Sequence, residues 1–170
     1  MRPGVAQVMK VAAGIRLVCF DVDGVLTDGR LGGDAESWGG FVTFFSRDGH
    51  GFQLLREAGI PVAWVSGNNW PAVQHKALRL KIPHLFLDTK DKACSVGFQA
   101  ETLGIPLSAV AFVGDDVNDL AAMEIVGLPI AVADADWEVR ARATYVTVAK
   151  GGHGAAREVA DLILAAKARP

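Results

Sequence analysis

The sequence predicts an α/β fold, a Rossmann-like three-layer sandwich in which a mainly parallel sheet is covered by helices on both faces. Short apolar runs alternate with segments of helical periodicity along most of the chain. The apolar runs are continuous, as expected for parallel strands that are buried on both faces. With 170 residues and 51% hydrophobic content, the chain fits one compact domain, residues 1–170, with a full core.

The individual elements follow from this alternation. Strands are expected at residues 15–21, 61–67, 84–88, 109–116, 129–132 and 144–148. Helices are expected at residues 51–59, 70–81, 91–104, 117–127 and 154–169. Gly59, Gly104 and Gly127 stand where three of these helices should end.

One segment interrupts the alternation of strands and helices. Residues 24–45 have β-favouring ends and a Gly-rich middle, and they contain the stretch VLTDGRLGGDAESWGGFVTFF. This pattern predicts a β-hairpin that projects from the sheet. Trp38 on this hairpin is expected to contact another subunit, because aromatic anchors are enriched in interfaces.

Charge and composition argue against several classes of partner. The formal net charge is −2 and the Lys and Arg residues are scattered, so no footprint for nucleic acid or a membrane surface is expected. No apolar run approaches the ~18 residues of a membrane span. Cys19 and Cys94 are expected to be buried free thiols, which is typical of a reducing compartment. We therefore expect a soluble, cytoplasmic protein.

Charged and polar side chains stand at the carboxyl ends of four predicted strands, or slightly beyond them. They are Asp21 and Asp23, Ser66, Lys92, and Asp115 with Asp116. In open α/β sheets this edge is where ligands bind, so these side chains should converge.

These residue types suit phosphoryl transfer. Carboxylates at positions i and i+2 of an extended segment point the same way, and together with Asp115 the pair Asp21 and Asp23 offers oxygen ligands for Mg²⁺. One aspartate can then attack phosphorus, while the other protonates the leaving oxygen and activates water. Ser66 and the amides after it can hold phosphate oxygens, and Lys92 can stabilise the shifting charge.

Four motifs, in order, resemble the haloacid dehalogenase superfamily: FDVDGVLTDG, VSG, Lys92 and GDDVND. The resemblance implies an aspartyl-phosphate mechanism with Asp21 as nucleophile and Asp23 as general acid and base. It implies that Ser66 binds phosphate and that Lys92 stabilises it.

The same resemblance assigns the metal site. Asp21, Asp115 and Asp23, the last through its backbone carbonyl, correspond to the Mg²⁺ ligands. Asp119 resembles an acid of the fourth motif that positions the metal ligands without binding the metal itself. Asp116 is a further candidate for this supporting role.

The intervals between Asp21, Ser66 and Lys92 are filled by the hairpin and single helices, so they leave no room for a cap domain. Across almost the whole chain, the segments DVDGVLTDG, SRDGHGFQLL, GDDVNDLAAMEIVGLPIAVADA and GGHGAAREVADLIL resemble the 3-deoxy-D-manno-octulosonate 8-phosphate phosphatase subfamily. That subfamily also includes phosphatases for nine-carbon sugar acids. The resemblance implies a homotetramer whose hairpins form a shared barrel and whose sites are closed by a neighbouring chain.

The substrate-facing positions depart from that subfamily. Asn68 stands where Arg is usual, Phe45 replaces a polar residue, and GGRGA reads GGHGA with His153. An Asn cannot supply the bidentate charge of an Arg. The expected substrate-binding residues are Gly67, Asn68, Arg47 and Lys76, whereas Asp48 is expected to cap its own helix.

Taken one at a time, these residues also have structural explanations. Ser66 can end its strand in a turn, Lys92 can be an ordinary exposed lysine, and Asp116 and Asp119 can stabilise the first turn of a helix. Four motifs in order, each near a strand end, favour the catalytic interpretation.

We therefore predict a Mg²⁺-dependent phosphatase that acts on a phosphorylated 2-keto-3-deoxy sugar acid, with the octulosonate 8-phosphate as the default substrate. A nine-carbon sugar-acid 9-phosphate is an alternative with the same chemistry. Two non-enzymatic alternatives are a receiver-type phosphoacceptor module and an assembly subunit descended from the phosphatases. The receiver normally carries its phosphoacceptor on a middle strand, where this chain reads VSGNN without an Asp.

Overall fold

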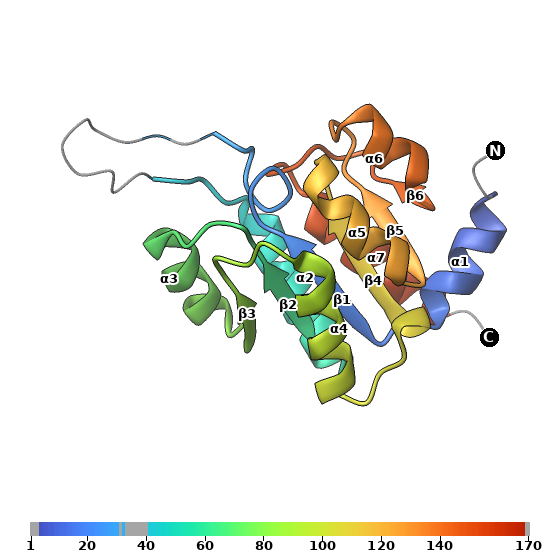
Figure 1. The fold of residues 1–170 in the computed structure, drawn as a ribbon. Helices are drawn as coiled ribbons and strands as arrows, with labels where there is room; N and C mark the ends of the chain where they lie inside the picture. The colour runs from blue at the N-terminus through green and yellow to red at the C-terminus, as the bar shows by residue number, and fades with distance from the viewer. Residues whose placement is uncertain (1–3, 31, 33–40, 169–170) are drawn as a thin grey trace.

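A six-stranded parallel sheet forms the centre of the molecule, with the strand order β3-β2-β1-β4-β5-β6 (Figure 1). The computed structural model describes residues 4–30, 32 and 41–168. The strands are β1 (Leu17–Asp21), β2 (Val62–Val65), β3 (His84–Phe86), β4 (Val110–Gly114), β5 (Leu128–Ala131) and β6 (Tyr145–Val146). All five neighbouring pairs are parallel. Five strands lie within a predicted strand range, and β5 overlaps the predicted range 129–132 but begins one residue earlier, at Leu128.

Helices cover both faces of this sheet (Figure 1). They are α1 (Val5–Ala13), α2 (Ser46–Glu57), α3 (Pro71–Leu80), α4 (Lys92–Thr102), α5 (Leu120–Ile125), α6 (Trp137–Arg142) and α7 (Ala155–Lys167), with 3₁₀ turns η1 (Leu107–Ala109) and η2 (Val117–Asp119). α7 packs against α1 and α2 on one face, and α4 packs against α5 on the other. The predicted three-layer α/β sandwich is confirmed.

The strand order predicts where a ligand binds on the sheet. The chain runs outward from β1 through β2 to β3, and then returns to continue from β4 through β5 to β6 on the other side. In such a sheet, ligands bind beyond the carboxyl ends of the two strands where the direction reverses, here β1 and β4. The receiver-type alternative would require the order 2-1-3-4-5, which this sheet does not have.

The core explains why the apolar runs are continuous. Every residue of β1, β2 and β4 is buried, including Phe20, Trp64 and Phe112. Phe52 of α2 meets the Phe20 ring edge-on, with ring centroids 5.3 Å apart. Trp64 is fully buried and belongs to the core. Trp70 lies at the N-cap of α3 with Pro71 as the first helical residue, as predicted.

Helix α2 begins at Ser46, earlier than the predicted 51–59. Gly49 and Gly51 are poor helix formers, so helix propensity gives little signal for this early start. A Cβ atom at Gly51 would lie 3.0 Å from the Cα of Arg157 in α7, so this glycine permits a close approach of the two helices. The packing partner therefore stabilises a helix that intrinsic propensity disfavours. Helices α1 and α6 were not predicted.

Cys94 corrects one expectation. Cys19 is buried, but Cys94 is exposed, and both are free thiols. Helix α4 turns Lys92, Val96, Gln99 and Ala100 inward, which leaves position 94 on the side facing solvent.

The predicted hairpin is described only at its base. Gly32 and Phe41 form an isolated antiparallel bridge that joins the two arms. These arms extend from the body of the molecule near the carboxyl edge of the sheet (Figure 1). Residues 31 and 33–40 lie outside the described residues, so the interface role of Trp38 stays a prediction. Among the described residues, no helix has the length and apolar character needed to cross a membrane.

Candidate active site

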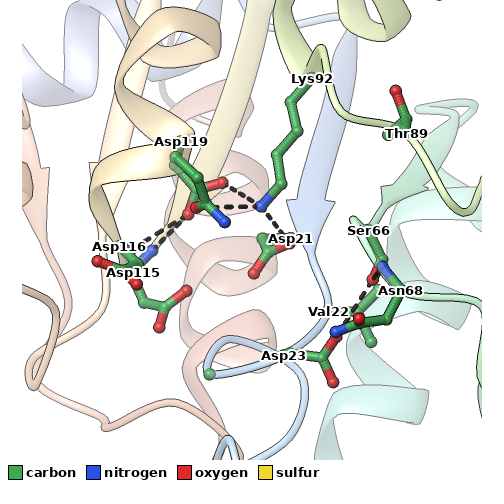
Figure 2. A network of polar contacts seen from close by, with 12 residues as sticks. Asp21, Val22, Asp23, Ser66, Asn68, Thr89, Lys92, Asp115, Asp116 and Asp119 are labelled. Carbon is green, nitrogen blue, oxygen red and sulfur yellow. Dashed lines mark hydrogen bonds and ion pairs between the residues drawn. The ribbon is translucent and has the colours of Figure 1, made fainter.

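Four segments bring the predicted catalytic residues to one edge of the sheet (Figure 2). Asp21 is the last residue of β1, and Ser66 follows the last residue of β2. Lys92 is the first residue of α4, and Asp115 follows the last residue of β4. The convergence expected from the sequence is present, and it lies beyond β1 and β4, where the strand order predicts a ligand site.

Lys92 connects two carboxylates at the centre of this edge. Its Nζ donates a hydrogen bond of 2.7 Å to Asp21 Oδ1 and one of 2.6 Å to Asp119 Oδ1. The three side chains are only 5%, 5% and 0% exposed for Lys92, Asp21 and Asp119, so the charges are shielded from water. Lys92 is therefore a buried, doubly paired cation, and the alternative of an ordinary exposed lysine is wrong.

The ionisation of this group reflects burial and mutual charge. Burial raises the pKa of Asp21 well above its usual range, the Asp119 carboxylate raises it further, and Lys92 opposes the rise. Burial alone would lower the pKa of Lys92, but the Asp21 and Asp119 carboxylates raise it. The lysine is thus held as a cation between two acids that would otherwise repel each other.

Asp119 is fixed by the turn that follows β4. Its Oδ2 accepts hydrogen bonds from the backbone N–H groups of Asp115 (2.9 Å) and Asp116 (3.3 Å), while its Oδ1 faces Lys92. The exposed Asp116 side chain accepts from the N–H of Val117 at 2.7 Å and caps the 3₁₀ turn η2. Asn118 Oδ1 is a further acceptor for Lys92 Nζ, at 3.4 Å, and sequence reasoning did not identify it.

Asp21, Asp115 and Asp119 form a group suited to a divalent cation. One carboxylate oxygen from each lies within 4.8 Å of the others. Asp115 Oδ1 is buried and has no hydrogen-bond partner in the described part of the chain. Burial, followed by the Asp119 charge, raises the pKa of Asp115 to about 7. An all-oxygen, negatively charged set with an unpaired oxygen fits a hard cation such as Mg²⁺.

The Asp23 side chain lies apart from this acidic group (Figure 2). Its Oδ2 accepts hydrogen bonds from Ser66 Oγ at 3.1 Å and from Asn68 Nδ2 at 3.0 Å. β1 ends at Asp21 and the buried Val22 begins a turn, so the extended geometry that would align the two carboxylates does not continue. The contribution of Asp23 to a metal site through its backbone carbonyl stays a prediction.

Ser66 and Asn68 form a small polar surface opposite the acids. Ser66 Oγ accepts from the backbone N–H of Asn68 at 3.0 Å, and the backbone O of Ser66 accepts from the N–H of Thr89 at 3.1 Å. Gly67 and Asn68 are exposed. A hydroxyl, an amide side chain and an open glycine backbone therefore face the same space as the acids, which suits the binding of an anion.

The loop after Asp23 forms a wall of the site that sequence reasoning missed. Gly24 adopts φ +92°, and a Cβ atom there would lie 2.0 Å from Asp115 Oδ2, so a side chain at this position would displace the carboxylate. The buried Thr27 holds the loop, since its Oγ1 accepts from the N–H of Gly29 at 3.2 Å and of Gly24 at 3.4 Å. The run VLTDG contained the signal, because Thr favours such turn hydrogen bonds.

The predicted substrate-binding cations lie near the base of the hairpin. The Arg47 guanidinium is exposed and lies 5.9 Å from the centre of the Phe45 ring. Lys76 Nζ lies 5.4 Å from the centre of the Phe44 ring, which stacks on Trp64. In the part of the chain that the structure describes, neither cation pairs with the acidic group, so their role towards substrate stays a prediction.

The comparisons with known proteins agree with this geometry. The haloacid dehalogenase-like hydrolase family profile matches residues 84–159. A 3-deoxy-D-manno-octulosonate 8-phosphate phosphatase of Escherichia coli (strain B / BL21-DE3) is 41% identical over 169 residues, which cover 98% of this chain and 88% of that protein.

Solved structures of relatives superpose closely. The phosphatase of Moraxella catarrhalis, crystallised with magnesium ion, phosphate ion and KDO, is 35% identical with a TM-score of 0.93 over 96% of this chain and 94% of that one. The cobalt-bound enzyme of Haemophilus influenzae is 37% identical with a TM-score of 0.89, over 92% and 91% of the two chains. The chain therefore belongs to the haloacid dehalogenase-like hydrolases and, within them, to the 3-deoxy-D-manno-octulosonate 8-phosphate phosphatase family.

Proposed function

We propose that this protein is a Mg²⁺-dependent phosphatase that hydrolyses 3-deoxy-D-manno-octulosonate 8-phosphate to the free sugar acid and inorganic phosphate. The observation that carries the proposal is the buried Lys92, held between Asp21 and Asp119 and close to Asp115 at the carboxyl edge of the sheet. Relatives with this activity in their names match nearly the whole chain, which supports the choice of reaction and substrate.

The metal would be held by Asp21, Asp115 and the backbone carbonyl of Asp23. Bound Mg²⁺ supplies positive charge that neutralises and orients the phosphoryl group. Asp119 is a positioning residue for this site, because it accepts from the backbone of Asp115 and Asp116 and pairs with Lys92.

Asp21 is the nucleophile in this proposal. One of its carboxylate oxygens bonds to phosphorus as the bond between phosphorus and the sugar oxygen breaks, which yields an aspartyl phosphate. Asp23 gives its proton to the departing sugar oxygen. It then takes a proton from water, whose oxygen bonds to phosphorus and releases the Asp21 carboxylate and inorganic phosphate.

The phosphate oxygens are held by groups on both sides of Asp21. The Lys92 Nζ atom lies 2.7 Å from Asp21 Oδ1. From there the lysine charge can stabilise the phosphoryl oxygens as they gain negative charge. The Ser66 hydroxyl and the backbone after Gly67 would bind from the opposite side. Asn68, Arg47 and Lys76 would contact the sugar acid.

The substrate assignment has one specific competitor. A nine-carbon sugar-acid 9-phosphate needs the same chemistry at phosphorus, and it would differ only in contacts to the sugar. Asn68 is the observation that keeps this competitor, because it departs from the Arg usual in the octulosonate enzymes at a position expected to contact the sugar acid and not phosphorus.

A panel of phosphate esters distinguishes these substrates. Phosphate release would be measured with Mg²⁺ for the octulosonate 8-phosphate, a nine-carbon sugar-acid 9-phosphate, a hexose phosphate and an aryl phosphate, with Asp21→Asn as the inactive control. The proposal predicts the highest kcat/KM for the octulosonate 8-phosphate. A preference for the nine-carbon ester would replace the substrate, and no release from any ester would favour a non-catalytic assembly subunit.

We further propose that the protein acts as a homotetramer in the cytoplasm, with the hairpin of residues 24–45 in place of a cap domain. The arms joined by the bridge between Gly32 and Phe41 extend from the body near the proposed site, which is where such a replacement is needed. Sedimentation at equilibrium should give a tetramer, and a stable monomer with full activity would contradict this arrangement.

A further inference from the structure

We propose that Asp48 is a positioning residue for the active site: its buried carboxylate fixes the amino end of α7, and through it the glycine-rich loop of residues 151–154 that supports the loop after Asp23. Among the described residues, Asp48 forms no hydrogen bond with the acidic group, so it would act through other residues. The prediction that Asp48 caps its own helix is wrong.

Asp48 reaches from α2 to the first turn of α7. Its Oδ1 accepts a hydrogen bond of 2.8 Å from the backbone N–H of Arg157, and the residue is only 3% exposed. The N-cap of α7 is Gly154, which has φ +102° and no side chain to accept this donor. An acid from another helix therefore takes the place of the missing capping side chain.

The pKa of the Asp48 carboxyl group is consistent with a charged cap at the start of α7. Burial raises the pKa of Asp48 to about 6, while the hydrogen bond from the backbone of Arg157, the nearby backbone of Gly154 and the nearby His153 oppose the rise. The carboxyl is thus ionised at neutral pH, where a negative charge at the amino end of a helix is favourable. The close approach of α2 and α7 at Gly51 leaves the carboxylate little freedom to move.

The loop before α7 is tightly packed on the loop after Asp23. The N–H of Gly152 donates to the backbone O of Val25 at 2.9 Å. A Cβ atom at Gly151 would lie 1.6 Å from the backbone O of Gly24, so nothing larger than glycine fits there. On its other side the N–H of Gly151 donates to Asp134 Oδ1 at 2.9 Å. A shift at the start of α7 would therefore be transmitted to Gly24 and Val25.

Gly24 in turn borders the metal-binding acids. The Asp115 carboxylate occupies the space where a side chain at Gly24 would lie, since an added Cβ would meet Asp115 Oδ2 at 2.0 Å. The sequence of contacts runs from Asp48 to Arg157, through the glycine loop to Gly24, and ends at Asp115. The step from Arg157 to the glycine loop follows the chain itself, and the other steps are a hydrogen bond or a packing contact too close for an additional methyl group.

The test compares Asp48→Ala and Asp48→Asn with Asp161→Asn. Asp161 is a matched control, because it is an exposed acid on α7 that pairs with the Arg157 side chain and not with the helix backbone. Two readouts are needed: kcat and KM for Mg²⁺-dependent release of phosphate from an aryl phosphate, and hydrogen exchange of the backbone amides of residues 24–29 and 151–157. All assays use full-length protein well below its unfolding temperature.

Asp48→Ala should lower kcat by about 10- to 100-fold, a typical cost of small misplacement at a catalytic site, with a smaller change in KM. The amides of residues 24–29 should exchange faster than in the control. Asp48→Asn should lie between the two, because its amide oxygen can still accept from Arg157. A folded Asp48 variant that equals Asp161→Asn in both kcat and exchange would overturn the proposal, and if Asp48→Ala does not fold, Asp48→Asn decides alone.

This inference rests on the proposed phosphatase function, and the two fail differently. If wild-type protein releases no phosphate, the proposed function fails while hydrogen exchange still tests the link from Asp48 to residues 24–29. If wild-type protein is active and the Asp48 variants match the control in both readouts, only the role of Asp48 fails.

Discussion

Asp21 and Asp23 are separated by one residue, yet they occupy contrasting environments. Asp21 is buried, pairs with Lys92 at 2.7 Å and belongs to an acidic group that fits a metal. Asp23 is half-buried, and its Oδ2 accepts from the uncharged groups of Ser66 and Asn68. Two like side chains acquire different chemistry because β1 ends between them.

The difference assigns the roles. A nucleophile must stay close to the metal and the phosphoryl group, which is where Asp21 is held by its cation. A proton carrier must be free of a strong ion pair and reach the leaving oxygen, which suits Asp23, whose Oδ1 has no hydrogen-bond partner in the described part of the chain. Different surroundings for two carboxyl groups are a recurring means of separating such roles.

The largest expected effect tests the Asp21 side of the comparison. Asp21→Asn should lower kcat by about 10³-fold or more, because the nucleophile is lost. The variant should fold, since it removes a buried charge while Lys92 keeps Asp119 as a partner. Phosphate release and a thermal melt measure both expectations, and activity within tenfold of wild type would remove Asp21 as nucleophile.

The loss of kcat on mutation of Asp23 should depend on how much the leaving oxygen needs a proton. Asp23→Asn should lower kcat by about 10²- to 10⁴-fold for an alkyl phosphate, because general acid catalysis is lost. The loss should be smaller for an aryl phosphate, whose oxygen leaves without a proton. An equal loss for both esters would mean that Asp23 does not protonate the leaving group.

The contribution of the Lys92 ion pairs to the Asp21 environment can be measured as folding stability. Lys92→Met should lower the free energy of unfolding by about 3–5 kcal/mol, because Asp21 and Asp119 are left as buried charges without their partner. Denaturant unfolding without Mg²⁺ measures this, with the exposed Lys90→Met as control. A Lys92 variant as stable as the Lys90 variant would show that the ion pairs contribute little.

Asp48 is buried like Asp21, but its hydrogen-bond donor is the backbone N–H of Arg157 and not a lysine side chain. Its pKa is raised by burial from 3.8 to about 6, so the folded state binds the proton more tightly than the unfolded state. Stability from this group is present below about pH 4 and is lost as the pH rises through 6. The stability of wild type relative to Asp48→Asn should fall by up to about 3 kcal/mol between these limits. Unfolding curves at several pH values that show no such divergence would contradict the raised pKa.

Metal binding gives the smallest predicted effect and separates the two aspartates directly. Mg²⁺ at 100 times its Kd should stabilise wild-type protein by about 2.7 kcal/mol. Asp21→Asn and Asp115→Asn should lose most of this shift, whereas Asp23→Asn should keep it, because only its backbone is proposed to bind the metal. Thermal melts with and without Mg²⁺ measure the shift, and its loss in Asp23→Asn would place that side chain on the metal.

Much of the fold follows from the sequence because the strands are buried on both faces. Continuous apolar runs such as VCF and VAWV have no other stable environment, and the polar residues that follow them mark one edge of the sheet. The sequence therefore locates Asp21, Ser66 and Asp115. It does not show that the alignment of Asp21 and Asp23 ends with the strand, since that depends on the turn stabilised by Thr27.

Features that depend on contacts distant in sequence could not be predicted. The reason for a glycine at position 51 is visible only when Arg157 is placed against it, and Asp48 reads as a local cap until the start of α7 is seen without a capping side chain. Both contacts join α2 to a helix about a hundred residues later in the chain. Periodicity and capping rules describe neighbours in sequence and contain no information on such pairs.

The stereochemistry at phosphorus tests the central claim most directly. Wild-type protein would hydrolyse a phosphorothioate ester made chiral at phosphorus with two oxygen isotopes, in water enriched in the third isotope, and the configuration of the released inorganic thiophosphate would be determined. An aspartyl phosphate at Asp21 requires two in-line displacements, so the account predicts net retention of configuration. Inversion would mean that water attacks the substrate directly, and it would contradict the role given to Asp21.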